Sequence, residues 1–264
     1  MILMPFAVHT INSRENLSWI LCCAWLRDSI EHNFGETSVS LSMGRNLLNP
    51  FRAVLFDFEG TIVDFQWKAA EAVEEASAAL TMFGFDKGLF NGCNYATLFN
   101  VSMEQAYGVG VSPGELSMKL GEIYDRYDLD ALDRWRPRDD AAYVLEKTRQ
   151  CGILTGLVTN AGKKAISLFL QRFRFEQLFD VVVTRNHVDR LKPDGSGILR
   201  AMKALKVERG ACLYVGDSVN DIKATRSVGI DIAAVLEGES PKNDIEAYKP
   251  RFVVDSLSSL LQII

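Results

Sequence analysis

The chain has 264 residues, of which 48% are hydrophobic and 24% are charged, and it contains no repeat or low-complexity segment. This composition excludes a largely disordered or collagen-like chain, and the length allows one or two domains. The formal net charge of −5 disfavours a broad nucleic-acid-binding surface, which needs an excess of lysine and arginine, so we expect no nucleic-acid partner.

The cysteines and histidines are too scattered to predict a zinc site or a disulfide framework. The chain has five cysteines without a CxxC pair, and none of its three histidines lies near a cysteine. Free thiols are typical of a reducing compartment, so we expect a cytoplasmic protein.

The first 50 residues differ in character from the rest of the chain. Their longest apolar run, Leu17–Leu26, has ten residues, and a membrane span needs roughly 18–20. No basic cluster precedes the run, as a signal peptide requires. We therefore expect a short buried or partner-facing helix there and no membrane association. The stretch that begins at Met43 would make an ordinary first segment of an α/β domain. Our hypothesis is therefore that residues 1–42 are a weakly ordered extension, or that the start of the protein is misassigned.

From residue 51 onward, short apolar runs alternate with helical patterns. Such runs are typical of strands that are buried on both faces of a sheet. Strands that alternate with helices imply right-handed crossovers and a parallel sheet, so we predict an α/β fold with a doubly wound, Rossmann-like parallel sheet. The predicted strands are Ala53–Phe56, Ile153–Val158, Val181–Val183, Cys212–Val215, Ile232–Leu236 and Phe252–Val254.

One long gap without a strand follows the first run. Within it, Lys68–Phe83 has apolar residues at helical spacing and is followed by Gly84. Ser112–Glu115 is a capping box with Pro113 at the first helical position, which predicts the start of a second helix. Further helices are predicted over Asp139–Gln150, Lys163–Phe173 and Asn220–Val228, the last of them ended by Gly229.

This pattern predicts a helical segment inserted into an α/β core. We expect a poorly defined N-terminal extension over residues 1–50, a Rossmann-like core over residues 51–64 and 135–264, and an α-helical cap over residues 65–134.

Ligands of an open parallel sheet bind beyond the carboxyl ends of its strands. The first predicted strand is followed by DFEGT, which contains Asp57, Glu59 and Gly60. Two carboxylates two residues apart lie on one side of an extended strand end, where they repel unless a cation lies between them. Oxygen ligands without histidine or cysteine suit Mg²⁺, and Gly60 allows a sharp turn. The alternative is that Asp57 merely caps a turn.

The next two strand ends carry groups that suit an anion. Thr159 and Asn160 supply a hydroxyl, an amide and free backbone N–H groups ahead of a helix, although an ordinary N-cap would look the same. Lys192 precedes Pro193, which favours an extended backbone at the lysine, and a solvated surface lysine is the alternative.

The fourth strand is followed by Asp217 and Asp221, which lie one helical turn apart if Asp217 opens a helix. An N-cap and a first-turn acid would explain one of them more easily than the pair.

Four adjacent strand ends with such groups favour a single site. Its four acids carry a charge of −4, and Mg²⁺ with Lys192 supplies +3, which leaves −1. The site therefore requires a cation. Its free N–H groups and Lys192 predict an anionic substrate.

In order and spacing, DFEGT, Thr159-Asn160, LKPD and GDSVND resemble the four motifs of the haloacid dehalogenase-like hydrolase superfamily. They look most like its phosphoglycolate phosphatase-type members, which carry a helical cap. The resemblance covers roughly residues 51–264. It implies an Mg²⁺-dependent phosphatase that hydrolyses a small phosphorylated metabolite through an aspartyl-phosphate intermediate.

The resemblance also implies roles for the motif residues. Asp57 would be the nucleophile and Glu59 the acid and base, with Lys192 as the third catalytic residue. The implied substrate-binding residues are Gly60, Thr159, Asn160 and Lys192. The implied metal ligands are Asp57, Glu59 through its backbone carbonyl, Asp217, and Asp221, which orients the metal shell through water or Lys192.

Two positions depart from the family pattern. Glu59 stands where aspartate is usual, as it does in the enolase-phosphatase branch, and its longer side chain must fold back to reach the same leaving oxygen. Gly195-Ser196 follows LKPD where a proline is common, and we expect only a locally altered turn there.

Three alternatives stay open. A dehalogenase on the same fold needs no acid two residues after the nucleophile, so Glu59 argues against it. A phosphosugar mutase needs proton-relaying groups in the cap, and residues 65–134 contain no histidine. A non-enzymatic regulatory protein that retains the fold would be favoured by the loss of a motif.

Lys87–Asn100 is either the substrate-facing part of the cap or a plain connector.

Overall fold

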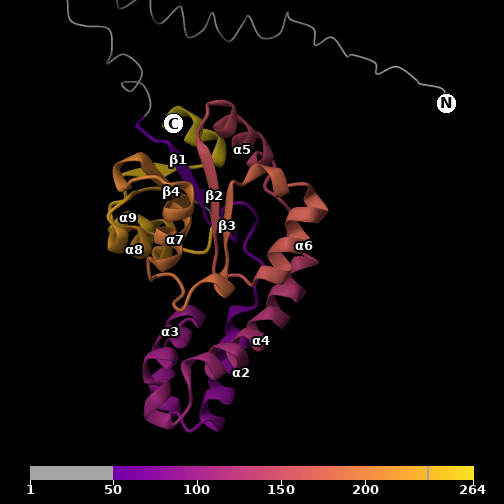
Figure 1. Ribbon diagram of the computed structural model, residues 1–264, viewed down its shortest axis with the longest axis vertical. Coiled ribbons are helices and arrows are strands. Elements are labelled where there is room, and N and C mark those ends of the chain that lie inside the picture. The colour runs from indigo at the N-terminus through magenta and orange to yellow at the C-terminus, as the bar shows by residue number, and fades with distance from the viewer. Residues whose placement is uncertain (1–49, 237) are drawn as a thin grey trace, which may run out of the picture. The chain divides into compact units, whose positions relative to one another are not determined.

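The computed structural model describes residues 50–236 and 238–264 (Figure 1). The predictions for the N-terminal extension, including the run Leu17–Leu26 and a domain start at Met43, lie outside the described residues. Within the described ranges, no helix combines the length and the apolar character needed to cross a membrane.

All six predicted strands are present in one parallel sheet with the order β3-β2-β1-β4-β5-β6. This is the strand order of a doubly wound fold, so the predicted fold class is confirmed. The ends of β2, β4 and β5 differ by one residue from the prediction. The strands are β1 (Ala53–Phe56), β2 (Leu154–Val158), β3 (Val181–Val183), β4 (Cys212–Gly216), β5 (Asp231–Val235) and β6 (Phe252–Val254).

The strands read as continuous apolar runs because both faces of the sheet are covered. On β1, Val54 and Phe56 belong to one hydrophobic cluster, whereas Ala53 and Leu55 belong to a second. Successive side chains of a strand point to opposite faces, so the two clusters lie on opposite sides of the sheet.

Helices cover the two faces separately (Figure 1). The first cluster includes residues of α5 (Ala141–Gln150) and α6 (Lys163–Phe173). The second includes residues of α7 (Ser196–Leu205), α8 (Val219–Val228) and α9 (Lys242–Ala247). The helices α7 and α9 were not predicted from the sequence.

Gly195 does more than alter a turn. It lies directly before α7, and a Cβ atom there would overlap Cγ2 of Val228 on α8. The glycine therefore allows the start of α7 to approach α8 closely, which a proline could not do at this position.

Between β1 and α5 the chain is entirely helical or irregular, apart from isolated bridges. The helices α2, α3 and α4 gather at the end of the sheet where β1 terminates (Figure 1). On α4, the Ser112 hydroxyl accepts the Glu115 N–H at 3.2 Å, which confirms the predicted helix start. The elements are α2 (Ala69–Met82), η1 (Lys87–Phe90), α3 (Tyr95–Gln105), η2 (Ala106–Val109) and α4 (Pro113–Leu132).

The segment Lys87–Asn100, considered above as a part of the cap or a plain connector, is largely helical. It contains all of η1 and the first half of α3. The apolar stripe of α3 is interrupted by buried polar side chains, Asn100 and Ser102, and this hid the helix in the sequence.

Candidate active site

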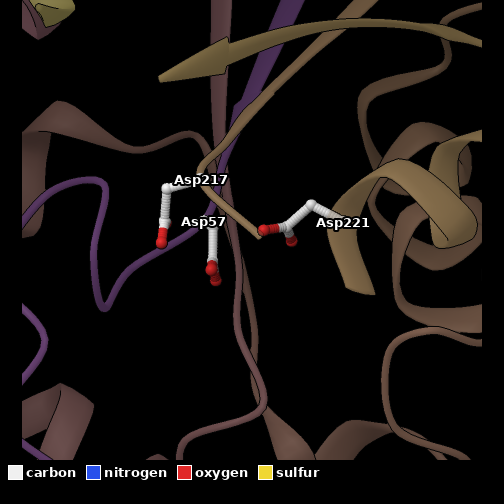
Figure 2. Close-up of side chains that lie close together, drawn as sticks. All are labelled: Asp57, Asp217 and Asp221. Carbon is white, nitrogen blue, oxygen red and sulfur yellow. The ribbon is translucent and has the colours of Figure 1, made fainter. Parts of the chain in front are cut away.

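Three buried aspartates meet where the strand order reverses, between β1 and β4. Asp57 follows β1, Asp217 follows β4, and Asp221 lies in the first turn of α8. Each offers a carboxylate oxygen, and these oxygens all lie within 4.8 Å of one another. Figure 2 shows the carboxyl groups of Asp57 and Asp217 side by side, with that of Asp221 directed toward them.

Lys192 joins this cluster from the segment that follows β3. Its Nζ lies 2.5 Å from Asp57 Oδ1 and 2.7 Å from Asp221 Oδ1, and it donates a hydrogen bond to the Tyr214 hydroxyl at 3.0 Å. The lysine is buried, so it is not the solvated surface residue that the sequence allowed. Its positive charge offsets only one of the three aspartates.

Asp217 is held by donors on both of its oxygens. The Thr61 hydroxyl donates to Oδ1 and the Glu239 N–H donates to Oδ2, each at 2.6 Å. Gly60 has a φ of +85°, and a Cβ atom there would overlap the Asp217 carboxylate. Glycine at position 60 is therefore required both by the backbone conformation and by the space that Asp217 occupies.

Asp221 uses both oxygens in hydrogen bonds. Oδ2 accepts the Ser218 N–H at 3.1 Å and the Ser218 O–H at 2.7 Å, and Oδ1 faces Lys192 and Tyr214. Ser218, and not Asp217, is the N-cap of α8, so the condition that Asp217 opens the helix is not met. These contacts suit a residue that orients Lys192.

Two acids of this cluster, Asp57 and Asp217, resist ionisation in their buried positions. Burial, followed by repulsion from Asp221, raises the pKa of Asp57 to about 8 and that of Asp217 to about 7. Burial alone would lower the pKa of Lys192, but attraction to Asp221 and Asp57 outweighs it and raises that pKa. A cation beside the carboxylates favours their ionised forms. A donor set of oxygens alone fits a small hard divalent cation, so the residues present fit such a metal.

Glu59 is not among the three clustered carboxylates. Its Oε1 accepts a hydrogen bond from the Trp135 indole Nε1–H at 2.7 Å and another from the Gln66 N–H at 3.2 Å. Burial raises the pKa of Glu59 to about 8, and these two donors only partly oppose the shift. Glu59 still lines the same pocket as Asp57.

The segment after β2 is more fully hydrogen-bonded than the sequence suggested. The Ala161 N–H donates to Thr159 Oγ1 at 3.0 Å and the Gly162 N–H donates to Asp128 Oδ2 at 2.8 Å, so these two N–H groups are not free. The Asn160 amide accepts the Lys192 N–H at 2.9 Å and donates to the Lys192 carbonyl at 3.2 Å. Asn160 thereby holds the backbone of Lys192.

Of the predicted site residues, Asp57, Glu59, Thr159, Asn160 and Lys192 line one narrow cavity of about 20 Å³, which has room for one or two water molecules. Gly60, Asp217 and Asp221 are not among the residues that line it. Sequence reasoning missed several of the residues around it. Thr61 stands within the first motif and could have been considered, whereas Tyr95, Trp135 and Tyr214 belong to no motif. The lining residues are Asp57, Glu59, Phe65, Tyr95, Thr159, Asn160, Ala161, Lys192, Ser218, Asn220 and Glu239.

The chain is similar to known proteins over most of its length. The model of a family described as haloacid dehalogenase-like hydrolase matches residues 54–235. The chain is 27% identical over 222 residues to the N-acetylmuramic acid 6-phosphate phosphatase of Pseudomonas aeruginosa, an alignment that covers 80% of this chain and 96% of the relative.

Solved structures show the same fold. One is a predicted phosphoglycolate phosphatase from Haemophilus somnus, with a TM-score of 0.55 and 20% identity over 82% of this chain and 99% of that one. Another is CbbY from Rhodobacter sphaeroides in complex with phosphate, with a TM-score of 0.55 and 16% identity over 80% of this chain and 96% of that one.

Proposed function

The chain belongs to the haloacid dehalogenase-like hydrolases, and from this premise we propose that it is an Mg²⁺-dependent phosphatase. It hydrolyses a small phosphorylated metabolite through an aspartyl-phosphate intermediate. The observation that carries this proposal is the buried contact of Asp57 with Lys192 beside Asp217 and Asp221, at the carboxyl ends of β1 and β4.

In the first step, the Asp57 carboxylate attacks the phosphorus atom. Lys192 engages Oδ1 of Asp57, so we assign the attack to Oδ2. The bond between phosphorus and the leaving oxygen breaks, and its electron pair stays on that oxygen. Glu59 donates the carboxyl proton that neutralises it, and its raised pKa keeps this proton available near neutral pH.

In the second step, the ionised Glu59 removes a proton from a water molecule, which then attacks the aspartyl-phosphate. The bond between Asp57 Oδ2 and phosphorus breaks and phosphate leaves, which restores the Asp57 carboxylate and the protonated Glu59. Thr159 Oγ1 accepts the Ala161 N–H, so its own O–H is available to donate to a phosphoryl oxygen. Lys192 provides positive charge beside the same oxygens, where negative charge gathers in the transition state.

A divalent cation held by Asp57, Asp217 and the Glu59 carbonyl would shield the nucleophile from the negative charge of the substrate. We assign Mg²⁺ because all of the available donors are oxygens. The oxygens of Asp221 already contact Lys192, Tyr214 and Ser218. We therefore assign Asp221 to orienting the metal shell through Lys192 or water.

We treat residues 65–134 as a cap and residues 51–64 and 135–264 as the core. The cavity is too small for a metabolite. We therefore expect the cap to move when a metabolite enters, and we expect the closed cap to exclude large protein substrates. A sugar phosphate is the first substrate class to test, with phosphoglycolate and nucleoside monophosphates beside it. The three cysteines within the described residues are free thiols, as expected for a cytoplasmic enzyme.

The proposal is tested with p-nitrophenyl phosphate, with and without Mg²⁺, on the full chain. We expect Mg²⁺-dependent turnover. Asp57→Asn should lower kcat at least about a thousandfold, or about 4 kcal/mol of barrier, because the nucleophile is lost. The matched control is Asp64→Asn in the same loop, whose side chain is 69% exposed and which should turn over normally.

Each alternative predicts a different result. Turnover retained in Asp57→Asn would contradict the nucleophile assignment. Halide release from a haloacid would favour a dehalogenase, and transfer between two positions of a sugar would favour a mutase. A wild-type chain that turns over no phosphorylated metabolite would favour a regulatory protein that retains the fold.

A further inference from the structure

Helix α3 contacts the segment before Lys192 through a buried side chain that the mechanism does not use. The Asn100 amide donates to the Leu191 carbonyl and accepts the Leu191 N–H, both at 2.8 Å. Asn100 is buried, and Leu191 directly precedes the lysine of the active site. We call this pair of hydrogen bonds the α3 contact.

Helix α4 contacts the segment after β2 through a buried ion pair. Asp128, which is 2% exposed, accepts the Gly162 N–H at 2.8 Å and an Arg185 Nη2–H at 2.7 Å through the same oxygen, Oδ2. Arg185 also donates to Asp125, one turn earlier on α4. We call the contacts of Asp128 with Gly162 and Arg185 the α4 contact.

Arg185 extends the α4 contact into the segment that binds the phosphoryl group. Its Nη1 donates to the Asn160 carbonyl at 2.9 Å, and its backbone N–H donates to the Ala161 carbonyl at 3.1 Å. A Cβ atom at Gly162 would overlap Asp125 Oδ1. The segment from Thr159 to Gly162 is thus packed against α4 with no space for a side chain at its last position.

The α3 contact and the α4 contact both support the same part of the active site, the joined segments that carry Thr159 and Lys192. Asn160 bonds both the N–H and the carbonyl of Lys192, so the segments that carry Thr159 and Lys192 are tied to each other. A buried ion pair is costly to form and adds little net stability, so burial of Asp128 and Arg185 calls for a role other than packing. Both contacts start on helices that lie between β1 and α5, the segment that must move when substrate enters.

From this geometry we infer that Asn100 and Asp128 are positioning residues, which set the phosphoryl-binding groups Thr159 and Lys192 in place only when α3 and α4 lie against the core. This inference rests on the proposed phosphatase function. It assigns to the helical segment a task beyond covering the pocket, because closing it completes the anion site. Substrate that enters while the segment is open meets a looser Thr159 and Lys192.

The test uses the full chain with two independent variants. Asp128→Asn keeps an acceptor for the Gly162 N–H but removes the charge that faces Arg185. Asn100→Asp keeps the acceptor for the Leu191 N–H but removes the donor to the Leu191 carbonyl. The matched control is Asp133→Asn, directly after the end of α4. Its side chain is 82% exposed, and it has a long ion pair of 3.8 Å with Arg172 of α6.

Three measurements are made in the presence of Mg²⁺. Amide hydrogen exchange reports on residues 159–162 and 191–192, with β1 and β4 as internal references. Titration with inorganic phosphate gives Kd, and p-nitrophenyl phosphate gives KM and kcat. In both variants we expect faster exchange in the two segments only, and Kd and KM raised about tenfold or more, as expected for the loss of a charge-assisted or buried hydrogen bond. The control should stay within twofold of the wild type.

The outcomes separate the inference from the proposed function. Exchange and Kd within twofold of the wild type in both folded variants would overturn the inference. Faster exchange in β1 and β4 as well would also overturn it, because the contacts would then only stabilise the fold. Faster exchange confined to the two segments supports the positioning role even if the wild type neither binds phosphate nor turns over, in which case the proposed function alone fails.

Discussion

Glu59 is the residue at which the first motif departs from the family pattern, and its surroundings explain the longer side chain. The carboxylate reaches the indole of Trp135, which is fully buried, and the backbone of Gln66. Aspartate is one methylene shorter and would leave the Trp135 Nε1–H without its acceptor. A buried donor without a partner costs about 1–3 kcal/mol, so glutamate and Trp135 form a matched pair.

The raised pKa of Glu59 predicts how activity depends on pH. With a pKa of about 8, the carboxyl group is protonated below that pH and can donate to the leaving oxygen. As pH rises above about 8 the proton is lost, so kcat/KM for a sugar phosphate should fall about tenfold per unit. The substrate p-nitrophenyl phosphate is an internal control, because its leaving group departs without a proton and its profile should be much flatter.

A pH profile measured with both substrates checks this assignment. Glu59→Gln should reduce kcat/KM for the sugar phosphate to the value that the wild type reaches at high pH, and should remove the decline of kcat/KM above about pH 8. Equal slopes for the two substrates, or an unchanged profile in Glu59→Gln, would contradict the role of Glu59 as the acid.

At the scale of elements, the turn after β1 decides where the acids can meet. The Gly60 N–H donates to the Val63 carbonyl at 2.7 Å and the Ile62 N–H donates to the Phe58 carbonyl at 2.8 Å, which folds the chain back sharply. Thr61 is thereby placed to bond Asp217 on the neighbouring strand end. A tight turn on one element thus supports a carboxylate on another.

Gly60→Ala should therefore lower the free energy of unfolding by more than the strain of a positive φ alone would. Its φ is +85° and the added Cβ would overlap Asp217, so we expect a loss of at least about 3 kcal/mol in the free energy of unfolding, together with loss of activity. Gly84→Ala is the matched control, because Gly84 has a φ of +93° and no atom near its Cβ position. That variant should cost about 1 kcal/mol and keep its activity.

Urea unfolding and p-nitrophenyl phosphate turnover distinguish the two glycines. Similar losses of stability in both variants, with activity retained in Gly60→Ala, would show that the approach of Asp217 does not require glycine.

At the scale of the whole molecule, the fold gathers acidic groups whose ionised forms it does not fully neutralise internally. Asp57, Asp217 and Asp221 are buried together, and Lys192 is the lysine that reaches them. Residues far apart in the chain supply this cluster, so a cation that binds there joins β1, β4 and α8. Binding to the folded state alone must then stabilise the entire domain.

Addition of Mg²⁺ should accordingly raise the melting temperature. A concentration one hundred times the dissociation constant corresponds to about 2.7 kcal/mol, and chelation should reverse the effect. Asp217→Asn should abolish the shift, whereas Asp64→Asn should retain it. Differential scanning calorimetry across a Mg²⁺ series checks this, and a wild-type melting temperature that is insensitive to Mg²⁺ would contradict the proposed metal site.

The elements that could be predicted are those whose physical cause is local. The six strands were found because each is an apolar run buried on both faces, and the start of α4 was found because Ser112 caps it. Helix α3 was missed because its buried face includes Asn100, whose partner Leu191 lies 91 residues away. A polar residue with a distant partner leaves no periodic signal.

The sequence by itself determined the doubly wound sheet and the residues that stand at its carboxyl edge, because strand burial and the loops that follow each strand are encoded over a few neighbouring positions. Only the tertiary structure decided how those residues are used. It turned Asn160 toward the backbone of Lys192, paired Glu59 with Trp135, and placed Asp128 against Gly162. Each of these contacts joins segments at least 32 residues apart, and their geometry depends on how helices and strands pack, which local patterns do not contain.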